Sequence, residues 1–372
     1  MKLGLYVHIP FCKRKCPYCD FYSSPIYLPE KDAYTDCIVS SIEKHRNKNL
    51  TADTLYFGGG TPILLGYQNV SKIISACSEV FSLDISKSEI TLEANPESVS
   101  GSEIRDLALS GVNRISMGLQ SSSAQELKSL GRNHSAQDVK RAVGFVKSAG
   151  ITNFSLDIML GIPGQTVGSA IASAEYCLSL GAPHISAYML KTEPDTPFYS
   201  LAPSLDIPDD DTTADIYEAV SDRLRKEGYN RYEISNFALP GFESAHNLKY
   251  WNCEEYLGFG PSAHSFLNGK RFFYPRDFDN FISSQGLCEP QFDSEGGGAD
   301  EFIMLRLRLQ NGFSLAELSE KYPGYPSAES EKIVSSAKKY SALGLVNFDG
   351  NKISLTDRGV LVSNSVIAGI IP

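Results

Sequence analysis

The chain has 372 residues, of which 42% are hydrophobic and 21% charged, a composition typical of folded globular proteins and unlike that of disordered or fibrous chains. Its formal net charge of −10 argues against a large nucleic-acid interface, and no apolar run approaches the roughly 18 residues that a membrane helix needs. The N-terminus lacks a secretion-signal pattern, so we expect a cytoplasmic, reducing environment in which the eight cysteines are thiols or metal ligands.

Short strand-like runs alternate with amphipathic helical stretches over roughly the first 200 residues. The clearest helix is predicted from Ser135 to Ala149, with Ser135 as its cap and Gly150 as its stop. Strands that alternate with helices are joined by right-handed crossovers into a parallel sheet, so we expect an α/β fold that is an open sheet or a barrel. The predicted strands are Leu3–Ile9, Thr54–Phe57, Glu89–Ala94, Arg114–Met117, Asn153–Leu160 and His184–Leu190.

Two further regions follow, and we place the boundaries at 1–200, 201–295 and 296–372. The middle region is rich in aromatic residues, with fourteen Phe, Tyr and Trp between Tyr229 and Phe281. It is predicted to cover something flat or apolar, either as a lid over the barrel or as a ligand surface. Gly296–Gly298 is predicted to be a flexible joint. The C-terminal domain after it is predicted to have three helices and a hairpin, and so resembles a winged helix.

The strongest chemical signal is the run Cys12-x3-Cys16-x2-Cys19 directly after the first predicted strand. Three thiolates on one loop can hold a [4Fe–4S] cluster, but they ligate only three of its four irons. Position 21 is Phe21, so the loop offers no fourth cysteine. The open iron is then a place for a chelating small molecule, whereas a structural zinc site would need four ligands. Unrelated thiols remain the third interpretation.

Other features follow the predicted strands in turn. Gly58-Gly59-Gly60-Thr61-Pro62 follows the second strand, Glu93 ends the third, Gln120 follows the fourth and Asp157 lies in the fifth. Because the C-terminal ends of parallel barrel strands share one face, we expect these residues to converge there. Alone, the glycine run is equally typical of a tight strand-to-helix turn.

The cysteine spacing and these strand-end features resemble the radical S-adenosylmethionine (SAM) superfamily. The resemblance implies a partial (β/α)6 barrel in which the amino and carboxylate groups of SAM chelate the open iron. It implies that Cys12, Cys16 and Cys19 bind the cluster. It also implies a set of SAM-contact residues, namely Tyr6, Tyr18, Gly59, Gly60, Thr61, Glu93, Gln120, Arg132 and Asp157.

Within that superfamily the chain resembles oxygen-independent coproporphyrinogen III oxidase-like proteins over nearly its whole length. The true oxidases carry a fourth cysteine where this chain has Phe21, and they have a longer arm before the cluster. A second branch, the HemW-type haem chaperones, is marked by His-Asn-x-x-Tyr-Trp, which occurs here as His246-Asn247-Leu248-Lys249-Tyr250-Trp251. The resemblance therefore favours a haem chaperone, with coproporphyrinogen oxidation or other tetrapyrrole-directed radical chemistry as the alternative.

His246 is the predicted haem ligand and His264 is the rival, because a neutral imidazole is a good axial ligand for haem iron. Delivery to an acceptor favours a haem site at the surface. Lys249, Arg271 and Arg276 are candidate partners for the propionates. A histidine in an aromatic segment is also typical of a packing role.

The expected cargo is haem, and the expected recipient is an acceptor haemoprotein. Lys13, Arg14 and Lys15 lie inside the cysteine loop of an otherwise acidic chain. They are either a solvated face or a docking patch for an acidic electron donor such as a flavodoxin or ferredoxin.

Overall fold

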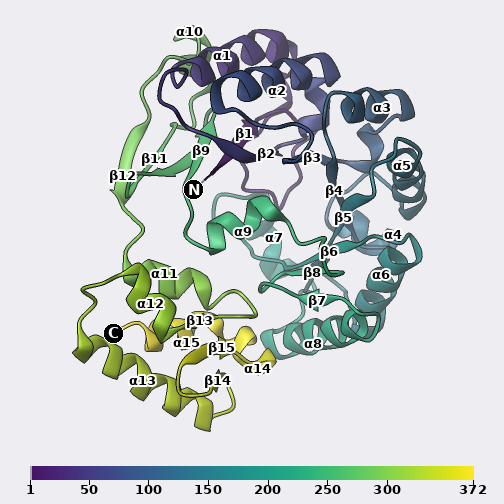
Figure 1. The fold of residues 1–372 in the computed structure, drawn as a ribbon. Coiled ribbons are helices and arrows are strands. Elements are labelled where there is room, and N and C mark those ends of the chain that lie inside the picture. Colours follow the sequence, from purple (N-terminus) through teal and green to yellow (C-terminus); the bar gives the residue numbers. More distant parts are fainter. Residues whose placement is uncertain (1) are drawn as a thin grey trace.

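A curved parallel sheet forms the centre of the molecule (Figure 1). The computed structural model describes residues 2–372, and its main sheet has twelve strands in the order β12-β11-β10-β9-β1-β2-β3-β4-β5-β6-β8-β7. Neighbouring strands from β1 to β6 are all parallel, so the predicted βα alternation is confirmed. These six strands are β1 (Leu3–Ile9), β2 (Ala52–Gly59), β3 (Glu89–Ala94), β4 (Arg114–Gln120), β5 (Asn153–Leu160) and β6 (His184–Met189).

Helices cover the outer, convex side of this sheet (Figure 1). The Ser135 hydroxyl accepts the Asp138 N–H, and the Asp138 carboxylate accepts the Ser135 N–H, so α5 begins with the capping box expected from sequence. The helices before the aromatic region are α1 (Lys31–Glu43), α2 (Tyr67–Phe81), α3 (Gly101–Leu109), α4 (Ala124–Ser129), α5 (Ala136–Ser148), α6 (Val167–Ser179), α7 (Pro197–Leu201) and α8 (Asp210–Lys226).

The two faces of the strands differ in polarity. Successive side chains of a strand point to opposite faces, and here apolar residues alternate with polar ones or glycine. The fully buried apolar set packs under the helices and includes Leu5, Val7, Leu55, Phe57, Ile90, Leu92, Ile115, Leu156 and Ile185. The other set faces the inside of the barrel and includes Tyr6, His8, Thr54, Tyr56, Glu93, Arg114, Ser116, Ser155, Asp157, His184 and Ser186.

The aromatic region extends the sheet at both edges, and its helix covers the lower end of the barrel (Figure 1). Strand β9 (Tyr256–Phe259) pairs in parallel with β1. The sheet continues with β10 (His264–Leu267), β11 (Lys270–Phe273) and β12 (Gln291–Glu295), each antiparallel to the strand before it. At the opposite edge, β8 (Asn236–Ala238) and β7 (Asn230–Arg231) follow β6. Most aromatic rings of this region are buried, because they join the existing core.

Helix α9 (Ala245–Trp251) lies between the barrel and the C-terminal domain (Figure 1). Its first residues meet the N-terminal ends of β2 and β3, because the Glu89 carboxylate accepts the N–H groups of Ala245 and His246 at 3.0 Å each. At its far end, Arg306 donates to the side-chain oxygen of Asn252 at 2.6 Å. We call the layer formed by α9 and these strand beginnings the barrel floor.

The C-terminal domain packs below the floor around the three-stranded sheet β13-β15-β14. The predicted hairpin is confirmed, while two short final helices were not expected from sequence. Gly296 and Gly297, the proposed joint, are hydrogen-bonded to Gly269 and Glu301 and pack against Phe266, so they are held in place. The remaining elements are α10 (Phe278–Ser283), α11 (Ala299–Arg306), β13 (Phe313–Ser314), α12 (Leu315–Lys321), α13 (Ser327–Ala342), β14 (Val346–Phe348), β15 (Lys352–Leu355), α14 (Asp357–Leu361) and α15 (Ser363–Ile370).

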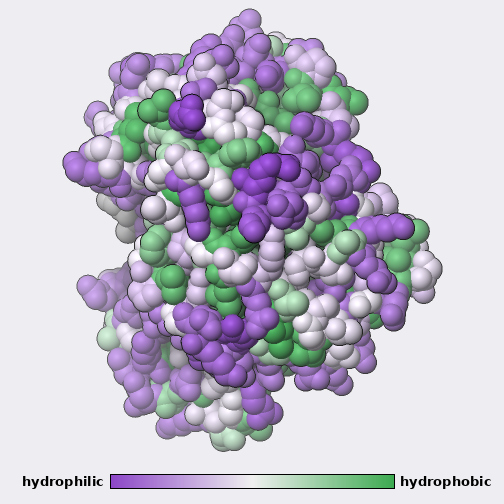
Figure 2. All heavy atoms as spheres, turned by 90° about the vertical axis from the view of Figure 1, so that its right-hand side faces the viewer, coloured by the Kyte–Doolittle hydropathy of each residue, from purple (hydrophilic) through white to green (hydrophobic). Residues whose placement is uncertain are grey.

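The helical side of the molecule carries hydrophilic residues with smaller hydrophobic areas between them (Figure 2). Leu109, at the end of α3, is the most exposed large apolar side chain, at 81%. Single exposed apolar residues of this kind are ordinary on protein surfaces. Within residues 2–372, no helix has both the length and the apolar character that a bilayer crossing requires.

Candidate functional site

A cavity of about 350 Å³ opens at the C-terminal ends of the barrel strands. All three cysteines of the loop after β1 line it, and so do residues from the ends of β2, β3, β4, β5 and β6. Its size falls within the range of small-molecule sites, about 300–1,000 Å³. We call this cavity the strand-end pocket, and its position agrees with the convergence predicted from sequence.

Eight of the nine predicted SAM-contact residues lie together in the lining. These are Tyr18, Gly59, Gly60, Thr61, Glu93, Gln120, Arg132 and Asp157. Tyr6 lies deeper in the barrel, where its hydroxyl bonds to His8 Nδ1 at 3.0 Å and its ring stacks on Tyr56. The structure therefore brings together all of the predicted set except Tyr6.

Two glycines let the turn after β2 approach the cysteine loop. Gly59 has φ +113°, a left-handed conformation that glycine adopts without strain. A Cβ at Gly60 would lie 2.5 Å from the backbone oxygen of Phe11 and 3.1 Å from Cys12 Sγ. The Thr61 N–H also donates to that Phe11 oxygen at 2.7 Å. The loop and the turn therefore form one packed unit, which only glycine at position 60 allows.

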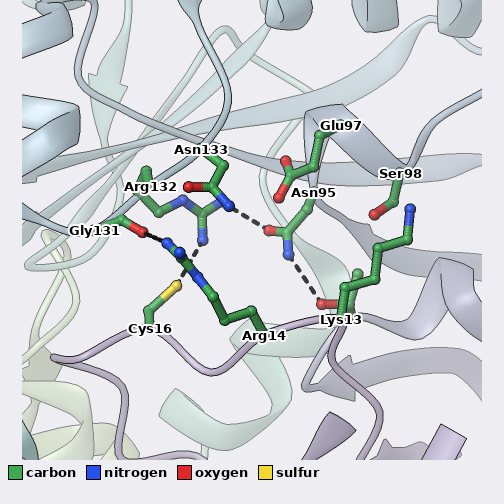
Figure 3. Close-up of a pocket in the computed structure, with 10 residues that line it drawn as sticks. Lys13, Arg14, Cys16, Asn95, Glu97, Ser98, Gly131, Arg132 and Asn133 are labelled. Carbon is green, nitrogen blue, oxygen red and sulfur yellow. Dashed lines mark hydrogen bonds between the residues drawn. The ribbon is translucent and has the colours of Figure 1, made fainter.

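A polar network holds the cysteine loop from the other side. Arg132 Nη1 donates to Cys16 Sγ at 3.3 Å, and Nη2 donates to the side-chain oxygen of Asn95 at 2.8 Å. Asn95 in turn donates to Thr61 Oγ1 at 2.9 Å. Figure 3 shows Arg132 between Cys16 and Asn95, in a smaller cavity of about 100 Å³ that Lys13 and Arg14 border.

The donor set fits an iron–sulfur cluster better than a single metal ion. Within residues 2–372, no group of three or more His, Cys, Asp or Glu side chains converges closely enough to hold one ion. Each thiolate of a cubane cluster binds a different iron, so the three sulfurs need not converge. Arg132 Nε is buried without a hydrogen-bond partner, which leaves a donor in the wall beside Cys16 for an anionic ligand.

Two carboxyl groups of the pocket are held by neighbouring donors. Glu93 accepts the Tyr56 hydroxyl at 2.8 Å and the Gly59 N–H at 3.1 Å, and Asp157 accepts the hydroxyls of Ser155 and Ser116 at 3.1 Å each. Burial raises the pKa of Glu93 to about 7, and Asp157 contributes to the rise. Burial also raises the pKa of Asp157. A ligand that donates hydrogen bonds to these two carboxyl groups therefore stabilises their ionised form.

Several residues of the pocket wall were not predicted, although the two-residue period of the strands indicates most of them. Asn95, Ser116, Met159 and Tyr188 line the pocket, and the first three lie two or four positions from predicted residues on the same strand or its end. Side chains two apart share a face of a strand, so the period of two predicts Asn95 from Glu93, Ser116 from Gln120 and Met159 from Asp157.

His246 lies in the barrel floor and not at the surface, which corrects the expectation of an exposed haem site. Its side chain is buried, its Nδ1 bonds to Thr54 Oγ1 at 2.9 Å and its Nε2 to the Tyr250 hydroxyl at 2.7 Å. Burial lowers the pKa of His246 to about 3, with help from Lys249 and Arg114, so the imidazole is neutral. His246 is buried because Glu89, at the start of β3, accepts hydrogen bonds from the first N–H groups of α9 and so holds the helix against the barrel.

His264 is exposed at the start of β10, where its ring stacks on Phe273 with centroids 5.3 Å apart. Two of the three predicted propionate partners are already engaged in ion pairs. Lys249 bonds to Asp53 at 2.9 Å and Arg271 to Glu301 at 2.5 Å, whereas Arg276 is exposed and 3.8 Å from Asp20. Only Arg276 of the three is therefore accessible to an added carboxylate.

Comparison with known proteins follows the same division of the chain. The family model described as the radical SAM superfamily matches residues 6–177, and the HemN C-terminal domain matches residues 299–362. The structure of Escherichia coli coproporphyrinogen III oxidase (HemN), a radical SAM enzyme, gives a TM-score of 0.85 over 100% of this chain and 90% of that one. Its sequence is 21% identical, so the likeness shows a shared fold.

Relatives in several bacteria share much more of the sequence. The heme chaperone HemW of Lactococcus lactis is 34% identical over 97% of this chain and 95% of its own length. The Bacillus subtilis heme chaperone HemW is 34% identical over 98% of both chains. That of Escherichia coli is 35% identical over 98% of this chain and 97% of its own. With this similarity along the whole length, the chain belongs to the heme chaperone HemW family of radical SAM proteins.

Proposed function

We propose that this protein binds haem and delivers it to haemoproteins, and that it holds a [4Fe–4S] cluster and SAM in the strand-end pocket. One observation carries the proposal. In a chain similar over its whole length to heme chaperones, three cysteines, a glycine turn and two carboxyl groups line a single cavity. The cysteine content favours a reducing compartment such as the cytoplasm.

The cluster ligands in this proposal are Cys12, Cys16 and Cys19. When bound, the cluster supplies an iron with an open coordination position and an electron for SAM. The chain's own residues then position the nucleoside. Gly59 and Gly60 give backbone access, Arg132 pairs with an anionic group, and Glu93 and Asp157 accept hydrogen bonds from ammonium or hydroxyl groups. Tyr18, Thr61 and Gln120 complete the wall, and Tyr6 supports it from below through Tyr56.

The proposed haem ligand is His246, with His264 as the alternative. The neutral imidazole of His246 is the form that binds haem iron, and it lies in the motif that marks the family branch. Because both its ring nitrogens are hydrogen-bonded, haem binding requires the His246 ring to shift so that Nε2 leaves the Tyr250 hydroxyl, which lies on the same helix. His264 needs no such shift, since it is already exposed beside Phe273 and near the accessible Arg276.

The proposed electron donor is an acidic protein of the flavodoxin or ferredoxin type. Lys13, Arg14 and Lys15 are all exposed, and they lie on the loop that carries the cysteines. Complementary charge raises the rate of encounter between partners, and salt screens it. Reduction of the cluster should therefore slow as salt rises, and a salt-independent rate would remove this docking surface from the proposal.

Haem titration of anaerobically reconstituted protein tests the function. The wild type should give a Soret band that saturates with haem, and His246→Ala should weaken binding about tenfold or more, the effect of losing one axial ligand bond worth at least 1.4 kcal/mol. His264→Ala is the matched variant, and a loss confined to it would move the ligand to β10. Equal binding by all three proteins would contradict both assignments.

The same preparation separates the chaperone from the oxidase alternative. Phe21 stands at the fourth-cysteine position and its side chain is 66% exposed at the edge of the pocket. Incubation with coproporphyrinogen III, SAM and a reductant is expected to give no vinyl product. Turnover without stable haem binding would replace the proposed function with oxidative decarboxylation.

A further inference from the structure

Side chains inside the barrel connect the strand-end pocket to the barrel floor. The inner faces of β2, β5 and β6 carry polar side chains between the floor and the pocket, including Thr54, Tyr56, Ser155, Asp157, His184 and Ser186. Glu93 and Asp157, the two carboxyl groups of the pocket, each begin a series of contacts that ends at α9. Both series run from the pocket toward the floor.

The first series is a continuous chain of hydrogen bonds. Ser155 Oγ lies 3.1 Å from Asp157 Oδ1 and 2.8 Å from His184 Nδ1. His184 Nε2 lies 2.8 Å from the Tyr232 hydroxyl, which also accepts the backbone N–H of Ser244 at 3.3 Å. Ser244 is the N-cap of α9. Four hydrogen bonds thus join a pocket carboxylate to the N-cap of the helix that carries His246.

The two ends of this chain fix the direction of every bond in it. An ionised Asp157 only accepts, and the Ser244 N–H only donates. Tyr232 therefore donates to His184 Nε2, His184 donates through Nδ1–H to Ser155, and Ser155 donates to Asp157. Ser155, His184 and Ser244 are each at most 1% exposed, so water does not replace a lost partner. A change at one end is therefore felt at the other.

The second series starts from Glu93. Tyr56 donates its hydroxyl to Glu93 at 2.8 Å, and its ring stacks on His246 with centroids 5.2 Å apart. His246 is bonded through Nε2 to Tyr250, one turn further along α9. The Tyr56 hydroxyl therefore contacts the pocket acid Glu93, and the Tyr56 ring contacts the proposed haem ligand His246.

We propose that the barrel interior couples the two sites, so that occupation of the strand-end pocket by SAM changes the affinity of His246 for haem. This inference rests on the proposed function and adds its regulation. A ligand whose hydroxyl or ammonium groups engage Glu93 and Asp157 draws on the same carboxylate oxygens that hold Tyr56 and Ser155. Weaker contacts to Tyr56 and Ser155 loosen the N-cap of α9 and the stacking of Tyr56 on His246, so the imidazole turns away more easily from Thr54 and from the Tyr250 hydroxyl. SAM should therefore tighten haem binding.

Paired titrations test the coupling on the full-length, cluster-reconstituted protein under anaerobic conditions. The dissociation constant of haem is measured from the Soret band with and without saturating SAM, and that of SAM by calorimetry with and without haem. The expected change is about fivefold or more, and thermodynamic linkage requires the same factor in both directions. The test variants are Tyr56→Phe, which keeps the ring and removes its bond to Glu93, and His184→Gln, which cannot span Ser155 and Tyr232.

The double variant Tyr56→Phe/His184→Gln should bring the factor close to one while haem and SAM still bind. Tyr176→Phe on α6 and His45→Gln in the turn after α1 are matched controls outside the barrel interior, and they should keep the wild-type factor. Ser155→Ala replaces His184→Gln if that variant does not fold, because the smaller change cuts the same chain. A wild-type factor of one, or an unchanged factor in the double variant, overturns the coupling although both ligands bind. Absence of haem binding by the wild type instead removes the proposed function, and the coupling with it.

Discussion

The strand-end pocket and the barrel floor are built from opposite ends of the same strands, yet their polar groups are used differently. In the pocket, Arg132 Nε lacks a partner, and Gln120 is held in a left-handed conformation at φ +65°. In the floor, His246 has both ring nitrogens bonded and Glu89 accepts two N–H groups of α9. The pocket therefore keeps a donor free for an added ligand, whereas His246 and the N-terminus of α9 are already hydrogen-bonded by the protein.

This difference shows where a ligand enters easily and where it must displace something. A molecule in the pocket can accept a hydrogen bond from Arg132 Nε, which lacks a partner. Haem at the proposed ligand His246 would replace bonds that the protein already makes, so the net free energy gained would be smaller than at a preformed site. Substitutions in the pocket and in the floor should therefore differ in their effects on ligand binding and on the free energy of unfolding.

The largest effect is expected from the cysteine loop. Cys16→Ser should abolish the cluster, because the remaining two thiolates cannot hold the three irons that the loop is proposed to bind. Iron and inorganic sulfide per chain, measured after anaerobic reconstitution, should fall to near zero. Cys288→Ser, a half-buried cysteine far along the chain, is the control and should retain the wild-type content. Wild-type iron in Cys16→Ser would remove that residue from the ligand set.

The acid in the pocket should make the protein without ligands less stable as pH rises. The carboxyl of Glu93 titrates near 4.5 when unfolded and, because of burial, its pKa is about 7 when folded. Between those values the folded chain binds more protons, so its free energy of unfolding falls with rising pH. Glu93→Gln should remove this fall, which is at most about 3 kcal/mol.

Denaturant titrations at about pH 5 and about pH 7.5 measure that difference on either side of the Glu93 transition. The exposed Glu331→Gln is the control and should leave the slope with pH unchanged. If Glu93→Gln showed the wild-type slope, another group would be responsible for it. Glu233, whose pKa burial also raises to about 7, would be the next variant to measure.

In the floor, Thr54→Val should cost about 1–3 kcal/mol, because it leaves His246 Nδ1 buried without a partner at nearly constant side-chain volume. Thermal or denaturant unfolding measures the cost. Thr54→Ser keeps the hydroxyl and should recover most of the loss. A Thr54→Val protein as stable as the wild type would mean that the floor is less satisfied than its geometry indicates.

The smallest effect is expected at Gln120. Glycine relieves the left-handed conformation, so Gln120→Gly should raise the free energy of unfolding by about 1 kcal/mol. Removal of its side chain from the pocket should at the same time weaken SAM binding, measured by calorimetry. The variant Gln120→Asn keeps a side-chain amide, tolerates the same backbone and serves as an intermediate control. A loss of stability in Gln120→Gly would show that the side chain contributes to folding and not only to the pocket.

The pocket is largely predictable from sequence, whereas the floor is not. Glu93, Gln120 and Asp157 follow strands whose alternation is visible in the sequence, and parallel strands bring their ends together whatever the loops do. Tyr6 lies outside the pocket lining because its position in β1 places it too deep in the barrel.

The location of α9 depends on contacts between distant parts of the chain. Glu89 and Thr54 fasten it under the barrel, and no local pattern around His246 signals those partners. The aromatic density of the region predicts a cover for something flat or apolar, but the rings complete the core beside β1. Sequence periodicity determines which side a residue faces, and only the assembled chain determines what lies opposite.

The alternation along β1 to β6 has a consequence for how this protein can vary. At one position a strand offers a side chain to the apolar space under the helices, where Leu, Ile, Val and Met exchange at a cost below about 1.5 kcal/mol. The next position lies in the hydrogen-bonded interior of the barrel. There, replacing a polar side chain with an apolar one leaves its hydrogen-bond partner buried without a bond. Tolerance of apolar substitutions should therefore alternate from one residue to the next along these strands. A saturation library read out by protein abundance would show this alternation as a period of two residues.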